Sequence, residues 1–511
     1  MLGDSKTGSR PGIAGLPTRP NILLLITDQE RYPTHWPAGW PSTNLPQWKR
    51  LQDHGLTFRR AYCVASMCSP SRASLFTGLY PKTHGVERTL SEGGSEPGLQ
   101  PTVQTMGHML ASAGYNVVYK GKWHLSRGDG VDDPSASQVA GYGFNNWEPP
   151  DAGEGTGIDG FGGGCSNNDG RFVTQAVNFL GTQTPEGTAT NPFALIVSLV
   201  NPHDVLAYPK TWDSDTCSGQ GYADQGSSMF AQGIDLADTV SYSADDLSTK
   251  PTCQKESLTL MAAALGIVNS TLERHNYINF YAYLHKVVDD RMRQVLEALD
   301  ANHLTDSTVI IRLSDHGEMG LAHGGLRQKI FNAYQETMHI PLVISHPNLA
   351  PMTTDCFASL VDLMPTLATL CGVPHPERFT FTGTDLTPLL TNPNAEVQSA
   401  ILFTFDDQNA GVNFNQTTVK QPNHIRCVRL KDADGEWMYA RYFDPSGQEP
   451  DQYEMYRLKD GPGTEVDPNE LDNLAGNSSW DSKRATLAQA LAALEKAKLI
   501  PYRNYLPALL K

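Results

Sequence analysis

Four short and almost uninterrupted apolar runs constrain the fold of this chain more than any other feature. They are Asn21–Thr27, Phe193–Val200, Val309–Leu313 and Ile340–Ser345. A half-exposed strand alternates apolar and polar residues, whereas a strand that is buried on both faces is apolar throughout. The four runs therefore predict inner strands of a parallel sheet that is covered on both sides.

Helical patterns separate these runs. Thr102 is a suitable N-cap for a helix that ends at Gly114, and residues 117–119 then predict a further strand. From Tyr277 to Leu299 apolar residues recur at three- and four-residue spacing, which predicts a long amphipathic helix before the Val309 run. Alternating strands and helices are typical of an α/β protein with a mostly parallel sheet.

The length of 511 residues predicts one large domain with a smaller domain or with insertions. Residues 1–18 are rich in Gly, Ser and Pro and predict a flexible leader, and residues 19–400 predict the main domain. A Gly/Ser/Asp-rich insertion at 205–270 predicts either a lid or substrate wall, or a disordered surface loop. Residues 401–511 predict a small α+β domain, with strands at 401–405 and 437–443 and a closing helix at 483–499.

Charge and cysteine usage narrow the function classes. The net charge of −16 argues against a nucleic-acid or anionic membrane surface. No apolar run approaches the ~20 residues of a membrane-spanning helix, and residues 1–20 lack the apolar core of a secretory signal, so we expect a cytoplasmic protein. The eight cysteines show no zinc-ligand spacing. Cys217 and Cys253 flank the polar insertion and could pair in an oxidising compartment. Nothing in the sequence indicates an oligomeric state.

Polar side chains follow the predicted buried strands, where open α/β sheets bind their ligands. These residues are Asp28 and Gln29, Lys122 and His124, His203, and Asp315 and His316. Carboxylate, amide and imidazole groups in one place favour a hard divalent cation, namely calcium, magnesium or manganese. A single Asp after a strand is more often a turn or cap residue. Four such positions in one chain favour a shared site.

The segment Cys68-Ser69-Pro70-Ser71-Arg72 is followed by Leu75, Thr77 and Gly78. It resembles the C-x-P-S-R signature of the type I sulfatases, a family within the alkaline phosphatase superfamily. A buried cysteine before a helix start would explain this segment alone, but further segments match the family in order. They are Gly121–Leu125, Asp315–Gly317, Lys329 with Tyr334 and Glu336, His339–Leu342, Leu363–Leu367 and Leu471–Ala475, so the resemblance covers about residues 19–475.

The resemblance implies an α/β, alkaline-phosphatase-like sandwich with a large, mostly parallel central sheet and a small C-terminal antiparallel sheet with a helix. It also implies that a formylglycine-generating enzyme oxidises Cys68 to formylglycine. The hydrated aldehyde has two hydroxyl groups: one attacks the sulfur of a sulfate ester, and the other expels sulfate and restores the aldehyde. An unmodified serine would lack this second hydroxyl.

The same resemblance implies a role for each candidate residue. One divalent metal ion, most often calcium in the family, would be bound by Asp28, Gln29, Asp315, His316 and the modified residue 68. Arg72 would orient the hydrated aldehyde, Lys122 would position it or the sulfate, and His124 would act as the base that releases sulfate. His203 would protonate or hydrogen-bond the leaving oxygen. Lys329 would contact the sulfate, although the match around it is loose.

Two departures from the family pattern affect the substrate. Many sulfatases have two adjacent acids where this chain has Asp28-Gln29, and Asp-Asn where it has Asp315-His316. The pair resembles the branch that contains choline sulfatases and phosphonate monoester hydrolases. Our first hypothesis is a sulfatase that acts on a small-molecule sulfate ester, which Ser71 before Arg72 favours. The alternatives are a phosphonate monoester or phosphodiester hydrolase with the same nucleophile, and a non-catalytic binding protein on this scaffold.

Overall fold

Strand β1 (Asn21–Asp28) lies inside a seven-stranded sheet, as its apolar run predicts. The computed structural model describes residues 13, 15–91, 94–128, 133–238, 245–411 and 418–501. Both faces of β1 are buried, because Leu23 and Leu25 belong to one hydrophobic cluster whereas Leu24 and Ile26 belong to another. Most of the predicted leader lies outside the described residues.

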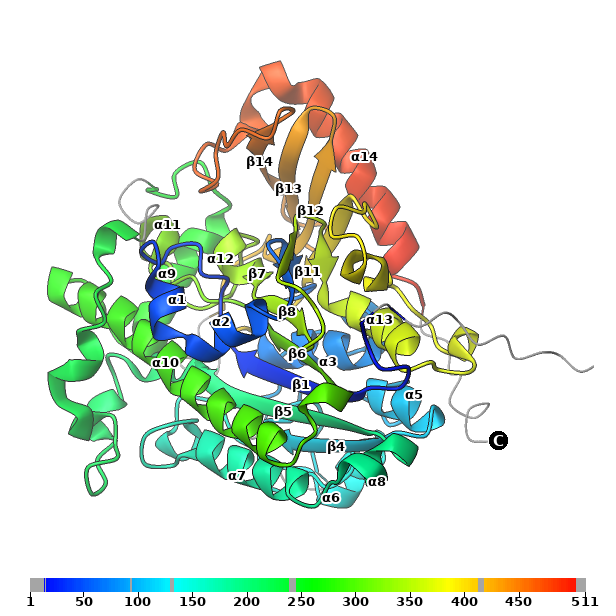
Figure 1. The fold of residues 1–511 in the computed structure, drawn as a ribbon. Helices are drawn as coiled ribbons and strands as arrows, with labels where there is room; N and C mark the ends of the chain where they lie inside the picture. Colours follow the sequence, from blue (N-terminus) through cyan, green and yellow to red (C-terminus); the bar gives the residue numbers. More distant parts are fainter. Residues whose placement is uncertain are drawn as a thin grey trace, which may run out of the picture.

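The strand order of this central sheet is β4-β5-β1-β6-β8-β2-β9 (Figure 1). The four strands β4, β5, β1 and β6 run parallel, whereas β8 is antiparallel to both β6 and β2. The predicted α/β class with a mostly parallel sheet is therefore confirmed. The bounds of the other strands are β4 Asn116–Gly121, β5 Phe193–Pro202, β6 Thr308–Ser314, β8 Leu342–Ser345, β2 Gly55–Phe58 and β9 Met352–Thr354.

The predicted strand at 340–345 is divided at Pro341. Residues His339–Ile340 form β7, which joins β3 (Ala61–Tyr62) and β10 (Ala358–Ser359) in a separate small sheet, and β8 begins at Leu342. Proline has no N–H group to donate to a neighbouring strand, so a ladder is interrupted there.

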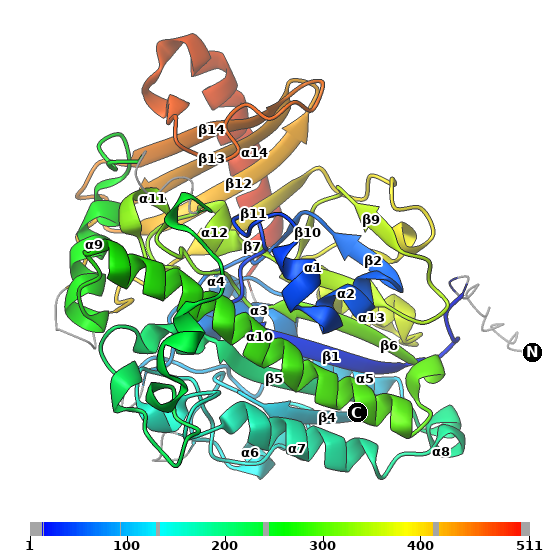
Figure 2. The ribbon, with the colours of Figure 1, turned by 60° about the vertical axis from the view of Figure 1, so that its left-hand side comes forward.

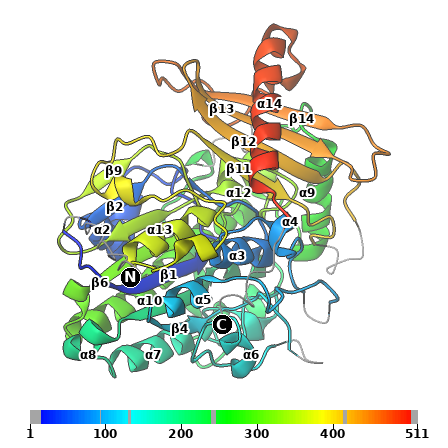
Figure 3. The same ribbon diagram turned by 90° about the vertical axis from the view of Figure 1, so that its right-hand side faces the viewer.

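Helices cover both faces of the central sheet. The long helix α10 (Thr271–Ala301) and α7 (Asn168–Leu180) lie on one face, as Figure 2 shows, and α10 confirms the predicted amphipathic helix. The other face carries α3 (Cys68–Thr77), α5 (Met106–Ser112) and α13 (Leu363–Leu370) (Figure 3). The shorter helices are α1 Trp40–Asn44, α2 Pro46–Gln52, α4 Pro81–His84, α6 Ala136–Ala140, α8 Pro185–Thr190, α11 Ala322–Gly325 and α12 Gln335–Met338.

Helix α5 begins later than Thr102, the predicted cap. Thr105 is its N-cap, and the Thr105 hydroxyl accepts a hydrogen bond of 3.1 Å from the backbone N–H of His108. Both threonines are acceptable cap residues by type, so the choice between them depends on where the preceding loop meets the sheet.

A four-stranded antiparallel sheet stands on the main body, with α14 (Asp481–Lys498) packed against it (Figures 1 and 3). This arrangement confirms the predicted small C-terminal sheet and closing helix. Strands, in order, are β11 Ala400–Phe405, β12 His424–Asp432, β13 Gly435–Phe443 and β14 Gln452–Asp460.

Buried polar contacts attach the small sheet to the main body. The Tyr334 hydroxyl donates to Oε1 of Glu454 over 2.8 Å. The carboxylate of Glu470 accepts a hydrogen bond of 2.8 Å from the backbone N–H of Gln335 and pairs with Arg429 of β12. The small sheet and the main body are therefore joined through carboxyl groups that no solvent reaches, because Glu454 and Glu470 are both fully buried.

The described part of the 205–270 insertion packs on α10. It contains short 3-10 helices up to Asp238 and then α9 (Thr252–Leu265). Rings of Tyr208 and Phe230 lie against Phe280 of α10, with centroids 6.5 and 6.2 Å apart. These aromatic contacts show that the described part of the segment is packed on α10; its role as a lid or substrate wall stays a prediction.

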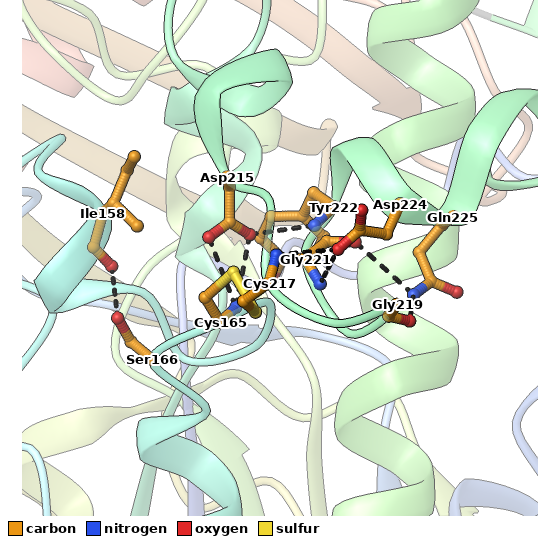
Figure 4. The surroundings of a disulfide bond; sticks show 10 residues. All are labelled: Ile158, Cys165, Ser166, Asp215, Cys217, Gly219, Gly221, Tyr222, Asp224 and Gln225. Carbon is orange, nitrogen blue, oxygen red and sulfur yellow. Dashed lines mark hydrogen bonds between the residues drawn. A yellow bond between two sulfur atoms is a disulfide. The ribbon is translucent and has the colours of Figure 1, made fainter.

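A disulfide joins Cys165 to Cys217, whose Cα atoms are 5.6 Å apart (Figure 4). The possible pairing of Cys217 with Cys253 is therefore not formed. Cys253 lies in α9, fully buried, and its sulfur donates toward the carbonyl oxygen of Phe331 at 3.7 Å. Positions along a chain do not determine which cysteines meet in space.

Within the described residues, no helix combines the length and the apolar character that a membrane crossing requires.

Candidate active site

The predicted site residues meet where four parallel strands end. β1 ends at Asp28, β4 leads to Lys122, β5 leads to His203 and β6 leads to Asp315. Cys68, the first residue of α3, lies among them. These side chains are all buried, with exposed fractions from 0% to 4%. The carboxyl ends of the strands thus form one polar site inside the protein.

Cys68 is surrounded by charged groups. Its Sγ lies 3.6 Å from Oδ1 of Asp28, 3.4 Å from Nε2 of His316 and 3.8 Å from Nζ of Lys329. Burial opposes ionisation, yet the nearby charges of Lys122, Lys329 and His316 hold the pKa of this thiol well below its usual value. An anionic group at this position is therefore stabilised.

Two buried cations neutralise the carboxylates. Arg72 places Nε 3.0 Å from Oδ2 of Asp315 and Nη2 3.3 Å from Oδ2 of Asp28. Its Nη1 donates to the hydroxyl of Ser198 over 2.8 Å. Lys122 places Nζ 2.6 Å from Oδ2 of Asp28. Charges this deeply buried persist only when they are paired, so these contacts keep both carboxylates ionisable.

The donor set fits a divalent metal ion. Asp28, Cys68, Asp315 and His316 each offer one ligand atom, all within 4.8 Å of one another and all buried. Burial and the charge of Asp28 raise the pKa of Asp315 to about 6. Two carboxylates at this distance repel each other, and a cation between them removes the repulsion.

Gln29 and Lys329 are joined. The Gln29 amide oxygen accepts a hydrogen bond of 2.6 Å from Nζ of Lys329, and its amide nitrogen donates to Glu318 over 2.5 Å. Gln29 also has a left-handed backbone with φ of 69°. The Gln29 amide oxygen, which is the predicted metal ligand, therefore already accepts a hydrogen bond from Lys329, and one of its lone pairs remains for a metal.

His124 is held by its backbone and by one ring nitrogen. Its N–H donates to Oδ2 of Asp151 over 2.7 Å, and Nε2 lies 2.7 Å from the carbonyl oxygen of Leu90. A carbonyl only accepts, so Nε2 carries the proton and Nδ1 is the basic nitrogen of the neutral ring. Burial opposes a second proton, yet interactions with Cys68 and Glu154 raise the pKa of His124.

His203 is neutral near pH 7. Burial and the charge of Lys122 lower its pKa to about 4. The next residue, Asp204, ties the chain at His203 to a neighbouring loop and to Tyr222. Its carboxylate accepts hydrogen bonds of 3.0 and 2.9 Å from the N–H groups of Gly162 and Gly163, and one of 2.5 Å from the Tyr222 hydroxyl.

Sequence reasoning missed three carboxylates that hold these residues in place: Glu318, Asp204 and Asp151. Two signals were available for them. Asp204 directly follows His203, and Glu318 follows Asp315 by three residues. A charged residue in such a position is rarely buried unless it is paired. Their partners come from distant parts of the chain and were not visible in the sequence.

The fold and the site define an enzyme that transfers a tetrahedral anionic group. A buried cysteine, a group of side chains that could hold a metal ion and several buried cations lie together, as such reactions require. The sulfatase family model matches residues 20–373, and the chain belongs to this family. It is a sulfuric ester hydrolase, and the predicted resemblance is confirmed.

Relatives of known name match most of the chain. An ulvan-active sulfatase of Formosa agariphila is 25% identical over 489 residues, which cover 89% of this chain and 80% of the relative. A choline-sulfatase of Rhizobium meliloti is 25% identical over 495 residues, covering 92% and 85%. Sulfatases that act on different sulfate esters are thus about equally similar to this chain.

Solved structures share the fold. BT4656, solved in complex with its substrate D-glucosamine-2-N,6-O-disulfate, has a TM-score of 0.64 at 21% identity and covers 94% of this chain and 98% of its own. The phosphonate monoester hydrolase of Agrobacterium radiobacter has a TM-score of 0.64 at 20% identity, covering 94% and 96%. The alkaline-phosphatase-like architecture is thereby confirmed.

Proposed function

We propose that the enzyme hydrolyses a small-molecule sulfate monoester with residue 68 as nucleophile, after oxidation of Cys68 to formylglycine. The position of Cys68 carries this proposal. Its sulfur lies within hydrogen-bonding distance of a carboxylate, an imidazole and a lysine ammonium, at the buried N-terminus of α3. Hydrated formylglycine there would supply an attacking hydroxyl and a second hydroxyl that lets sulfate depart.

We also propose that Asp28, Asp315, His316 and residue 68 hold one divalent cation, with Gln29 beside it. The cation would supply Lewis-acid stabilisation of the charge on the sulfate oxygens. Two carboxylate donors and a neighbouring amide oxygen favour calcium, with magnesium and manganese as alternatives.

Four other side chains act on the nucleophile and the substrate. Arg72 pairs with both carboxylates, which reduces their mutual repulsion, and orients residue 68. Lys122 is ion-paired with Asp28 and donates to the carbonyl oxygen of Gly153, and it offers its one remaining donor to the hydrated aldehyde or the sulfate. Lys329 lies 3.8 Å from the Cys68 sulfur and is placed to bind the anionic sulfate. His124, with Nδ1 as its basic nitrogen, removes the proton that allows sulfate to leave.

His203 stabilises the leaving alcohol. Its pKa of about 4 means that the neutral ring offers one N–H to the departing oxygen at physiological pH. A substrate whose leaving oxygen gains more negative charge depends more strongly on that hydrogen bond.

A phosphonate monoester or phosphodiester hydrolase is the second candidate function. The neutral Gln29 leaves the site less anionic than two adjacent carboxylates would, and a phosphodiester carries the same single charge as a sulfate monoester. A non-catalytic binding protein is less well supported, because Cys68, Arg72 and Lys122 are all present and in mutual contact range.

Maturation requires a formylglycine-generating enzyme as a partner. The expected cytoplasmic location is disfavoured by the Cys165–Cys217 disulfide, because such bonds persist mainly in oxidising compartments. We therefore propose that the enzyme works in an oxidising compartment.

Peptide mass spectrometry across residues 61–72 tests the nucleophile. Protein from its native host should show the aldehyde mass in place of the Cys68 thiol, and an intact thiol would refute the mechanism. Turnover of 4-nitrophenyl sulfate and of an aryl phosphodiester by the same preparation separates the two candidate functions. Cys68→Ala should abolish turnover of both while the melting temperature stays unchanged.

A further inference from the structure

We propose that Glu318 is a positioning residue for the sulfatase reaction: it orients the Gln29 amide and thereby aims the ammonium of Lys329 at residue 68. The proposal rests on the proposed function, because it assigns to Lys329 the binding of an anionic group. Glu318 itself is fully buried and has no contact with Cys68 among the described residues.

Every contact of the Glu318 carboxylate is with a hydrogen-bond donor. Oε1 accepts from the Tyr277 hydroxyl over 2.7 Å and from the N–H groups of Gly320 and Gln328, both over 3.0 Å. Oε2 accepts from the Gln29 amide nitrogen over 2.5 Å and shares the N–H of Gln328 at 3.1 Å. Only an acceptor with no proton of its own satisfies this set.

The Gln29 amide has one acceptable orientation between its two neighbours. Lys329 has only donors, so it requires the amide oxygen, whereas the Glu318 carboxylate only accepts, so it requires the amide nitrogen. The reverse orientation would place two donors face to face on one side and two acceptors face to face on the other. Glu318 therefore determines which end of the amide Lys329 meets.

The backbone around Gln29 is fixed independently. Its N–H donates to Oδ1 of Asp315 over 3.2 Å, and its carbonyl oxygen accepts from the Tyr281 hydroxyl over 2.6 Å. These bonds hold Gln29 at a backbone φ of 69°, a conformation that residues other than glycine rarely adopt. Rotation of the amide group is the freedom that remains, and Glu318 removes it.

Glu318 also fixes the backbone next to Lys329. It accepts the N–H of Gln328, the preceding residue, whose φ is likewise 69°. The backbone just before Lys329 is thus bonded directly to the Glu318 carboxylate, and the Lys329 ammonium is connected to the same carboxylate through Gln29.

A neutral amide between the two charges matters for the substrate. A carboxylate at position 29 would pair directly with Lys329 and cancel its charge. The amide holds the ammonium by hydrogen bonding while leaving its full charge 3.8 Å from the Cys68 sulfur. That charge is then available to an anionic sulfate.

Glu318→Gln tests whether Glu318 positions Lys329 through Gln29, because it changes the side chain's hydrogen bonding but hardly its shape. Its oxygen is expected to stay with Tyr277, Gly320 and Gln328, so its new NH₂ group would face Gln29. The Gln29 amide would then reverse and present donors to Lys329, which would be displaced. We expect kcat/KM for 4-nitrophenyl sulfate to fall on the order of tenfold to hundredfold, as for the loss of a charged hydrogen bond.

A double-mutant cycle with Lys329→Met separates positioning from a general structural effect. If Glu318 acts through Lys329, then Glu318→Gln should change kcat/KM by less than about twofold in the Lys329→Met background. An equal fold-loss in both backgrounds would overturn the proposal. Tyr277→Phe is the matched control, since it removes another donor to Glu318 without touching Gln29, and it should leave kcat/KM nearly unchanged.

Glu318→Asp provides the same test if Glu318→Gln does not fold. It keeps an acceptor-only carboxylate but shortens its reach to the Gln29 amide nitrogen, so its loss of kcat/KM should also disappear in the Lys329→Met background, and persistence of that loss overturns the proposal. Formylglycine content and bound metal are measured for every variant. Wild-type protein that carries formylglycine but lacks sulfatase turnover would refute the proposed function instead, so the two failures are distinguishable.

Discussion

The buried carboxylates of Asp28 and Asp315 face the same imidazole nitrogen. Nε2 of His316 lies 3.7 Å from Oδ1 of Asp28 and 3.6 Å from Oδ1 of Asp315. Arg72 contacts both acids from the other side. A metal ion bound to these two carboxylate oxygens and this ring nitrogen would remove the repulsion between the two carboxylates.

Metal affinity should therefore depend on pH. Burial and the charge of Asp28 raise the pKa of Asp315 to about 6, so below that pH a proton occupies the carboxylate and competes with the cation. We predict a clear loss of calcium affinity between about pH 7 and about pH 5, measured by isothermal titration calorimetry on metal-stripped protein. Asp315→Asn should bind weakly at both values, and an affinity that does not change with pH in the wild type would contradict the assignment.

The role of His203 predicts a dependence on the leaving group. In His203→Gln the rate with 4-nitrophenyl sulfate should fall modestly, because nitrophenolate needs little stabilisation. The rate with an alkyl sulfate should fall on the order of a hundredfold or more. Comparison of kcat/KM over a series of aryl and alkyl sulfates measures this, and equal losses across the series would remove the assigned role.

Loss of the disulfide should destabilise the protein. Cys165→Ser and Cys217→Ser each open a loop of 52 residues, and ~2–4 kcal/mol is a typical cost for such a change. Cys356→Ser is the matched control, since Cys356 is a half-buried cysteine outside this bond. Melting temperatures of the three variants, with non-reducing peptide mapping of the wild type, provide the measurement. Equal stability of all three would show that the bond does not form or does not matter.

His323 predicts a pH-dependent stability. Burial opposes its charged form, but the hydrogen bond to Asp245 and the nearby carboxylate of Glu336 raise its pKa from 6.5 to about 9. The folded state therefore holds this proton more tightly than the unfolded state, so the stabilisation is complete below about pH 6.5 and is lost as pH rises through about 9. The difference corresponds to ~3 kcal/mol. The melting temperature should be measured against pH for wild type and His323→Gln. The wild type should lose more stability than the variant as pH rises through this range, and an equal dependence on pH in both proteins would disprove the effect.

The main sheet could be predicted because its signal is local. β1 is apolar at every position from Ile22 to Ile26, and both of its faces are buried in the structure. Asp28 and Asp315 could be located for the same reason, since each follows such a strand. Cys68 was marked by its own motif. These features depend on runs of ten residues or fewer.

The supporting contacts depend on distance along the chain and could not be predicted in the same way. Glu318 and Gln29 are separated by 289 positions, and the Cys165–Cys217 bond spans 52. Pro341 was present in a predicted strand, but only the folded chain shows that the two halves join different sheets. Chain folding determines such pairings, and residue type alone does not.

The small C-terminal sheet contributes no described residue to the site, yet buried Glu454 and Glu470 connect it to Tyr334 and Gln335 in the main body. Substitutions at those two acids would leave uncompensated buried groups and would lower the population of folded enzyme. The residues of the site itself would be unchanged in such variants. Enzyme abundance and catalytic competence are thus separable traits, encoded in different parts of the chain.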